Sequence, residues 1–281
     1  MTPPVAGRPG PALPPPGVGR PRVRIELRDD DVLFFVHIPK TGGMSLISVL
    51  ERQFRPPEIF PPHSYMGSEG FEAYSEVERR RFKLVRAHLH AGSFSYVARY
   101  IASNPLLLTL LRDPVERLVS AYRHILRHAS NPLHDELVRR KVSLLEYVTS
   151  PDYAHVTANF QTWMVVGALN CHLDPRDIRL SDEARLALAR QRLEQFAFVG
   201  LTHRYRESLE LLYYTFGWPP SDEVPVENAA PVRTEREAID EEVRAAIVER
   251  SPLDVILLAE AERLFDARCA RMRQERGLDG P

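Results

Sequence analysis

The feature that most constrains the fold is a short apolar run followed at once by a glycine-containing turn and an amphipathic segment. The apolar run, from Val32 to Val36, has the composition of a buried strand. The turn that follows reads His37-Ile38-Pro39-Lys40-Thr41-Gly42-Gly43. Apolar residues then recur at helical spacing, at Leu46, Ile47, Val49, Leu50 and Phe54. A strand, a tight turn and a helix in this order are typical of one unit of a parallel α/β sheet.

The turn has the chemistry of an anion-binding site. Gly42 and Gly43 allow the backbone to approach a ligand oxygen closely. The helix after the turn directs its first N–H groups and the positive end of its dipole toward the same place. Lys40 adds a full positive charge, and Thr41 and Ser45 add hydroxyl donors. A plain strand-to-helix turn that carries a lysine is the structural alternative.

The order of residues separates this turn from the usual nucleoside-triphosphate loop. That loop places its glycines before the lysine, as G-x-x-x-x-G-K-[ST]. Here the lysine comes first, as Lys40-Thr41-Gly42-Gly43. The turn is therefore not the usual nucleoside-triphosphate loop, although its residues still suit a phosphate-like group.

A second unit repeats the pattern further along the chain. The run from Leu106 to Leu111 predicts another buried strand. Asp113 then fits an N-cap, Pro114 the first helical position, and Glu116 the third position of a capping box. The chain is therefore expected to start a helix at Pro114.

Arg112 and Ser120 are the candidate phosphate ligands of this second unit. Arg112 stands at the carboxyl end of the predicted strand, where α/β sheets bind ligands. Ser120 lies about two turns into the predicted helix, and an arginine and a serine together can hold a phosphate. Taken singly, Arg112 could cap a neighbouring carbonyl group and Ser120 could be an exposed helix residue.

Together, the two motifs resemble those of the carbohydrate sulfotransferases, the group that includes heparan sulfate 2-O-sulfotransferase. The residues from His37 to Ser45 are similar to the 5′-phosphosulfate loop of that family, and those from Arg112 to Tyr122 to its 3′-phosphate motif. Weaker similarities cover Asn159-Phe160-Gln161-Thr162, Phe198-Val199-Gly200-Leu201-Thr202 with Ser208-Leu209, Leu253-Asp254 and Leu264-Phe265. The resemblance spans roughly residues 32 to 266.

The pattern of elements and the resemblance predict the same architecture. Further strand candidates at Phe82–Ala87 and Phe196–Leu201 alternate with helical segments, which favours an α/β fold with a parallel sheet covered by helices on both faces. The resemblance implies one P-loop-like sulfotransferase domain over residues 30–272. Residues 1–29 are expected to form a disordered tail rich in proline and glycine, and residues 273–281 a flexible C-terminus.

The resemblance also implies a donor and a set of donor-binding residues. The donor is 3′-phosphoadenosine 5′-phosphosulfate (PAPS), which the family uses without a metal ion, and the product is 3′-phosphoadenosine 5′-phosphate (PAP). The acceptor is a hydroxyl group, expected to be that of a carbohydrate. Lys40 is expected to stabilise the charge that grows on the leaving phosphate. The residues implied to bind the donor are Lys40, Thr41, Gly42, Gly43, Met44, Ser45, Arg112 and Ser120.

Two histidines are candidates for the general base. His88 follows the strand candidate that ends at Ala87, where relatives in this family carry a catalytic histidine. Histidine has an ordinary pKa near 6.5, which suits proton transfer near neutral pH. His90 would lie on the same side of an extended segment and could assist. A structural or surface role for either ring is the alternative, whereas His37 is expected to shape the donor loop.

Charge, hydropathy and cysteine content limit the kinds of partner and site that we expect. The net charge of −1 gives no global field that favours nucleic acid. The sequence has no stretch of about 18 apolar residues, so no membrane span is expected. The expected location is the cytoplasm. Cys171 and Cys269 show no metal-binding spacing, so neither a disulfide framework nor a metal site is expected. The oligomeric state stays open.

Two other classes of function compete with the sulfotransferase interpretation. The first is a kinase-like P-loop enzyme, which would need a lysine after its glycines and an acidic metal ligand. The second is a non-catalytic binding protein of the same fold, whose proline-rich tail serves as a recognition segment.

Overall fold

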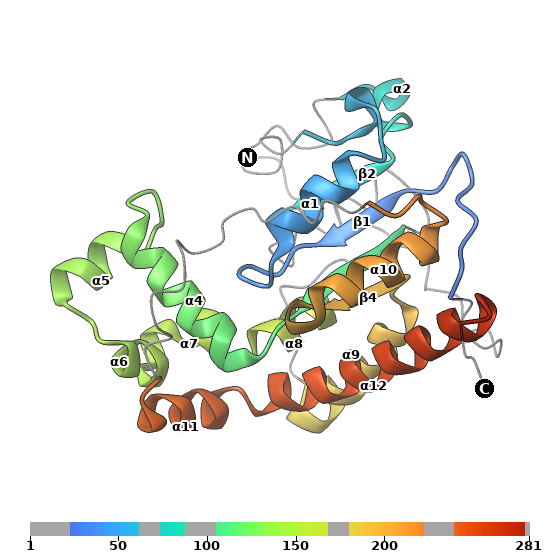
Figure 1. Cartoon of the computed structure of the whole chain (residues 1–281). Coiled ribbons are helices and arrows are strands. Elements are labelled where there is room, and N and C mark those ends of the chain that lie inside the picture. The colour runs from blue at the N-terminus through green and yellow to red at the C-terminus, as the bar shows by residue number, and fades with distance from the viewer. Residues whose placement is uncertain (1–22, 62–73, 88–104, 168–179, 222–238, 279–281) are drawn as a thin grey trace.

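The computed structural model describes residues 23–61, 74–87, 105–167, 180–221 and 239–278 (Figure 1). Within them, four strands form one sheet with the order β2-β1-β3-β4. All three pairs of neighbouring strands are parallel. The strands are β1 (Leu33–Val36), β2 (Leu84–Ala87), β3 (Leu106–Leu111) and β4 (Phe198–Leu201). The α/β class with a parallel sheet, expected from the sequence, is confirmed.

Both faces of the sheet are covered. Successive residues of a strand point to opposite faces, and all four residues of β1 are buried. Phe34 and Phe35, which are adjacent in β1, are both fully inaccessible to solvent. The covering helices include α1 (Gly43–Glu51), α8 (Phe160–Gly167), α9 (Asp182–Gln195), α10 (Tyr205–Phe216) and α12 (Pro252–Glu275).

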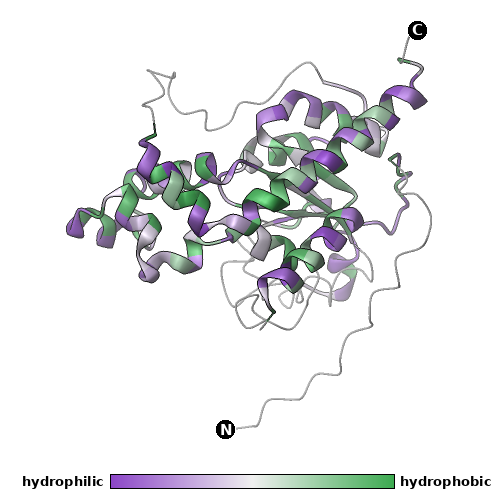
Figure 2. Cartoon of the chain, turned by 90° about the horizontal axis from the view of Figure 1, so that it is seen from below, coloured by the Kyte–Doolittle hydropathy of each residue, from purple (hydrophilic) through white to green (hydrophobic). Residues whose placement is uncertain are grey.

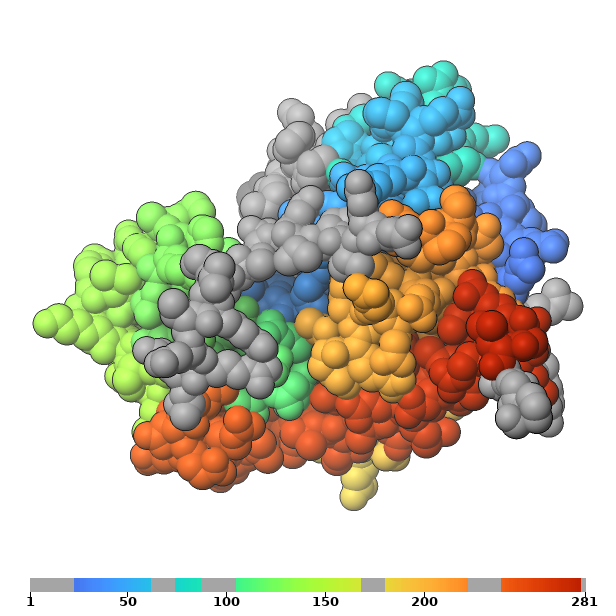
Figure 3. All heavy atoms as spheres, in the orientation of Figure 1, coloured from blue at the N-terminus to red at the C-terminus, as the bar shows by residue number. Residues whose placement is uncertain are grey.

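A group of helices, called here the helical lobe, projects from the side of the sheet (Figures 1 and 3). It has a hydrophobic cluster of its own, in which Tyr147, Tyr153 and Ile247 are buried. The lobe contains α4 (Pro114–Arg127), α5 (His134–Arg140), α6 (Leu144–Thr149), α7 (Ala154–Thr157) and α11 (Glu241–Arg250). Helix α4 starts directly after β3 and therefore joins the lobe to the sheet.

Short elements complete the described part of the chain. They are α2 (Glu76–Arg79) and the 3₁₀ helices η1 (Pro56–Glu58), η4 (Pro151–Tyr153) and η6 (Thr202–Arg204). Apolar residues gather along the strands and on the inner sides of the helices, as Figure 2 shows. Among the described helices, none is both long and apolar enough to cross a membrane.

The packed region begins a few residues before the start expected from the sequence, and the last helix ends a few residues after the expected end. Val23 is buried in the main core, and the N–H of Ile25 donates to the carbonyl oxygen of Thr215 at 2.7 Å. At the other end, α12 continues to Glu275, with Met272 buried. Apolar side chains at Val23 and Met272 explain why the chain stays packed at these positions.

The sequence also favours a helix that begins at a capping box of Thr234 and Glu237 and runs to about Glu249, but both cap residues lie outside the described ranges. Within those ranges, α11 begins at Glu241. Asp240 is its N-cap, and its carboxylate accepts from the N–H of Glu242 at 2.9 Å. The local aspartate cap therefore sets the start of this helix.

Candidate functional site

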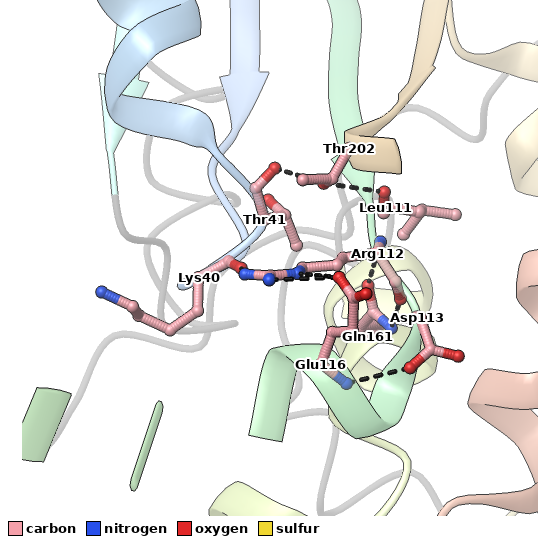
Figure 4. A network of polar contacts seen from close by, with 8 residues as sticks. All are labelled: Lys40, Thr41, Leu111, Arg112, Asp113, Glu116, Gln161 and Thr202. Carbon is pink, nitrogen blue, oxygen red and sulfur yellow. Dashed lines mark hydrogen bonds and ion pairs between the residues drawn. The ribbon is translucent and has the colours of Figure 1, made fainter. Parts of the chain in front are cut away.

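The two motifs that the sequence singles out meet at one edge of the sheet. β1 and β3 are neighbouring parallel strands, so their carboxyl ends lie side by side. The donor loop, defined here as residues 37–42, follows β1, and Arg112 follows β3. Nη1 of Arg112 donates to the carbonyl oxygen of Lys40 at 3.0 Å. Figure 4 shows this contact and the side chains around it.

The donor loop turns sharply into the N-terminus of α1. Lys40 has φ 71° and Gly42 has φ 86°, both in the left-handed region that favours glycine. The Thr41 hydroxyl is buried and donates to the carbonyl oxygen of Ile38 at 2.9 Å. Gly42, the N-cap of α1, has no side chain that could cap the helix, and the first turn of α1 contains no acidic residue. The positive end of the α1 dipole therefore faces the loop without a counter-charge of its own.

Gly43 is required where the loop meets the helix. A Cβ atom at Gly43 would lie 2.1 Å from Cδ2 of His37. The His37 ring is buried and stacks on Phe35, with ring centroids 5.3 Å apart. The ring of His37 therefore fills the space beside Gly43 and packs inside the fold.

Lys40 extends from the loop with its amino group directed away from Arg112 (Figure 4). Burial lowers the pKa of the Lys40 ammonium below its ordinary value, and the positive charges of Arg127 and Arg112 lower it further. The charged groups that shift this pKa are thus both cations. Such a concentration of positive charge suits an anionic ligand, which would relieve the repulsion.

Arg112 is oriented by several contacts. Its Nε and Nη2 both donate to Oε2 of Glu116, each at 3.2 Å. Asp113 caps α4 as expected, since its Oδ1 accepts from the N–H of Glu116 at 2.9 Å, and Pro114 opens the helix. The Glu116 carboxylate accepts from Arg112. Of the two hydrogen bonds of the expected capping box, the one from the N–H of Glu116 to Asp113 is formed. Ser120 is half-buried, eight residues after Arg112 and further along α4.

The main chain of Arg112 is held by Gln161 at the start of α8. The Gln161 carboxamide oxygen accepts from the N–H of Arg112 at 3.0 Å, and its Nε2 donates to the Arg112 carbonyl oxygen at 2.7 Å. Gln161 is buried. The sequence pointed to this residue only as part of a weak family similarity and gave it no role.

Helices α8 and α12 cap each other and so fix Gln161. Oδ1 of Asn159 accepts from the N–H of Leu253 at 2.8 Å in the first turn of α12. The Asp254 carboxylate accepts from the N–H groups of Gln161 at 3.0 Å and Thr162 at 2.7 Å. Burial raises the pKa of the Asp254 carboxyl, although nearby Arg117 and these hydrogen bonds oppose the change. The two segments Asn159–Thr162 and Leu253–Asp254, which carry weak family similarities far apart in sequence, therefore form one network of helix caps.

Thr202 joins the strand ends from the side of β4. Its Oγ1 lies 2.5 Å from the carbonyl oxygen of Thr41 and 3.1 Å from that of Leu111. Ser208 supports the same segment, since its hydroxyl oxygen accepts from the N–H of Leu201 at 2.8 Å. Sequence reasoning missed the contact of Thr202 because it depends on the order of the strands.

Three further residues that the sequence singles out are His88, His90 and Met44. His88 and His90 lie outside the described residues. The side chain of Met44 is exposed, so at this position the backbone N–H of the first turn of α1 is what can serve a ligand. In the described part of the chain, no group of three or more His, Cys, Asp or Glu side chains could hold a metal ion.

Comparison with known proteins points to one family. The model of the sulfotransferase family matches residues 24–255, which include both motifs. Heparan-sulfate 6-O-sulfotransferase 2 of Gallus gallus is 26% identical over 296 residues, covering 90% of this chain and 72% of that protein. The Homo sapiens protein of that name is 26% identical over 299 residues, covering 90% of this chain and 48% of its own length.

A relative of another kind also matches. The protein-tyrosine sulfotransferase of Arabidopsis thaliana is 21% identical over 267 residues, covering 71% of this chain and 52% of that protein. The chain thus spans about half the length of the human and plant relatives. Its resemblance to the carbohydrate sulfotransferases is confirmed, whereas the choice between 2-O and 6-O members is not resolved. The match over most of the chain, with both motifs at one sheet edge, shows that this protein belongs to the sulfotransferase family.

Proposed function

We propose that this protein transfers the sulfuryl group of PAPS to a hydroxyl group of a carbohydrate acceptor. The observation that carries the proposal is the direct bond from Arg112 to the Lys40 carbonyl, which places the two phosphate motifs at one sheet edge. The N-terminus of α1, whose N-cap is Gly42, adds oriented N–H groups at the same place. A donor with a 5′-phosphosulfate and a 3′-phosphate fits two such motifs.

The donor loop would bind the 5′-phosphosulfate. The N–H groups of Gly43, Met44 and Ser45, in the first turn of α1, point toward the carboxyl edge of the sheet, as the first N–H groups of a helix do. Lys40 supplies a cation whose pKa is lowered by burial and by other cations. Because charge builds on the bridging phosphate oxygen as its bond to sulfur breaks, a fixed cation there lowers the barrier.

Arg112 and Ser120 would bind the 3′-phosphate. The fork of the Arg112 guanidinium is already oriented by Glu116 and by the Lys40 carbonyl oxygen. An oriented guanidinium loses less conformational freedom when it binds a phosphate, and it suits a bidentate contact. The 3′-phosphate would distinguish PAPS from ATP.

His88 is our proposal for the general base, with His90 as the second candidate. In an in-line transfer, the acceptor oxygen forms a bond to sulfur while the bond from sulfur to the phosphate oxygen breaks. The proton of the acceptor hydroxyl passes to the imidazole, and PAP leaves. His88 follows β2, whose neighbour β1 leads into the donor loop.

The donor is tested by thermal unfolding with ligands. PAP at micromolar concentration should raise the melting temperature, because a ligand that binds only the folded state stabilises it. AMP should raise it far less. Stabilisation by ATP with magnesium and none by PAP would support a kinase-like enzyme and overturn the donor assignment.

The acceptor is tested with radiolabelled PAPS. The relatives named heparan-sulfate 6-O-sulfotransferases support desulfated heparan-type oligosaccharides as the first acceptors to assay. Tyrosine-containing peptides form the second arm, because one relative is named a protein-tyrosine sulfotransferase. Label in peptides alone would contradict the carbohydrate acceptor. Donor binding with no transfer to any acceptor would favour a non-catalytic binding protein.

A further inference from the structure

We infer that Thr202 is a positioning residue that sets the spacing between the two phosphate motifs. The inference rests on the proposed function, since it takes PAPS and PAP as the ligands of these motifs. Thr202 itself comes from neither motif. It opens η6 directly after β4, and its hydroxyl group reaches two other strand ends.

The hydroxyl group of Thr202 contacts one carbonyl oxygen of each motif. Its Oγ1 lies 2.5 Å from the carbonyl oxygen of Thr41, inside the donor loop. It also lies 3.1 Å from the carbonyl oxygen of Leu111, the residue directly before Arg112. A hydroxyl group has one hydrogen to donate, so the two carbonyl groups share it. Thr202 stands between the two carbonyl groups in Figure 4.

The Thr202 contact works beside a second link. Arg112 donates to the carbonyl oxygen of Lys40, the residue before Thr41. Consecutive carbonyl groups of the donor loop are therefore tied to the end of β3, one by Arg112 and one by Thr202. The loop includes Lys40 at φ 71°, a conformation that a residue with a side chain keeps only when its surroundings hold it.

The link through Thr202 does not depend on the ligand-binding side chain of Arg112. A phosphate that binds the Arg112 guanidinium can draw it away from the Lys40 carbonyl, whereas Thr202 keeps hold of the main chain. The methyl group of Thr202 also faces the loop, since a Cβ atom added at Gly42 would lie 3.7 Å from its Cγ2, at van der Waals distance. The distance between the motifs can thus stay fixed while the donor binds and leaves.

A fixed distance between two sub-sites favours a ligand that occupies both. PAP carries a 5′-phosphate and a 3′-phosphate, whereas 5′-AMP and 3′-AMP each carry only one of them. Loss of the Thr202 link should therefore weaken PAP far more than either monophosphate, since only PAP depends on the spacing. This selective loss separates a positioning role from general destabilisation.

The test compares Thr202→Val and Thr202→Ser by calorimetric titration with PAP, 5′-AMP and 3′-AMP. Thr202→Val keeps the branched shape and removes the hydroxyl group. It should weaken PAP about tenfold, the effect of losing one well-placed hydrogen bond. Each monophosphate should change by about twofold or less. Thr202→Ser keeps the hydroxyl group and should retain nearly all of the PAP affinity.

Thr109→Val is the matched control. The Thr109 hydroxyl also bonds a strand carbonyl, that of Val36 at 3.0 Å, and it also joins β3 to β1. It lies inside the sheet, so Thr109→Val should lower the melting temperature without changing the ratio of PAP to monophosphate affinity.

In PAPS turnover, Thr202→Val should raise the KM for PAPS more than it lowers kcat.

The outcomes are distinguishable. If the wild-type protein shows no preference for PAP over both monophosphates, the donor proposal fails before any variant is compared. If the wild type prefers PAP and Thr202→Val weakens all three ligands equally, or changes none, the positioning role is wrong. The positioning role is also wrong if Thr109→Val reduces the preference for PAP as much as Thr202→Val does.

Discussion

The carboxamide of Gln161 pairs with the main chain of Arg112 as another strand would, by accepting from its N–H and donating to its carbonyl oxygen. This pairing continues the hydrogen bonding of β3 past its last residue, at the point where α4 begins. Gln161 is itself fixed by Asp254 from α12, so the position of Arg112 depends on two segments, α8 and α12, that are distant from it in sequence.

Gln161→Leu should destabilise the protein. The leucine leaves the N–H and the carbonyl oxygen of Arg112 without their partners, which we expect to lower the free energy of unfolding by about 2 kcal/mol. PAP affinity should fall with it. Urea unfolding and calorimetric titration measure the two effects. Gln191→Leu, at an exposed position of α9, is the control and should change neither. Equal stability of both variants would show that the pairing with Arg112 contributes nothing.

The local parts of the fold could be predicted from the sequence. The apolar run at Leu106–Leu111 is β3 with the same bounds, and the helix expected to start at Pro114 is α4. The cap at Asp113 was also found, because a short side chain before a proline and an apolar stripe identifies a helix start on its own. Each of these signals lies within one segment.

The contacts between segments could not be predicted in the same way. Thr202 and Gln161 are placed by the order of the strands and by the mutual capping of α8 and α12, neither of which a single sequence shows. Within the helical lobe, α4 is predicted, but the sequence from Asn131 to Tyr153 indicates only a polar, partly helical segment, because α5 and α6 have just one or two buried residues each. What those helices bury becomes visible only when they pack together.

Gly43→Ala should destabilise the protein only while His37 is present. The added methyl group would lie 2.1 Å from the His37 ring, and overpacking of this kind costs about 2 kcal/mol. In the His37→Ala background the methyl group finds space, and alanine is favoured over glycine in a helix. The same change should then be neutral or stabilising. A double-mutant cycle in urea measures this coupling. Equal effects of Gly43→Ala in both backgrounds would contradict the packing.

Arg127→Gln should move the alkaline limb of the pH profile of kcat/KM for PAPS to higher pH. Lys40 must be protonated to stabilise the leaving phosphate, so activity falls as pH rises through its pKa in the free enzyme. That pKa is lowered by burial and then by Arg127 and Arg112. Removing the charge of Arg127 takes away one of these causes, so the pKa rises and the limb moves up.

Arg139→Gln is the control for Arg127→Gln. Nε of Arg139 donates to the carbonyl oxygen of Asp135 at 3.0 Å, as that of Arg127 does to Arg123 at 3.1 Å, so both arginines sit alike at their helix ends. Arg139 is not among the groups that shift the pKa of Lys40. The profile of Arg139→Gln should therefore match that of the wild type. An equal shift in both variants would mean that Lys40 is not the group titrating.

Lys40→Ala should reduce turnover more than it weakens PAP binding. The main service of a cation at this place is to the transition state, in which the leaving phosphate oxygen gains charge. Steady-state kinetics with PAPS and calorimetric titration with PAP separate the two quantities. Lys40→Arg keeps the charge and serves as the comparison. Normal kcat in Lys40→Ala, with only a raised KM for PAPS, would show that Lys40 binds the donor and does not assist the transfer.

His88→Ala should lower turnover by about 10²–10⁴, the usual contribution of a positioned general base. PAP affinity should stay nearly unchanged, because a base for the acceptor hydroxyl does not hold the nucleotide. In the wild type, activity should fall as pH drops through the pKa of this histidine, since a protonated ring cannot accept a proton. His90→Ala is the parallel variant, assayed with the same acceptor. If it alone loses activity, the base is His90. If both variants stay active, the proton goes to another group, and the histidine mechanism is wrong.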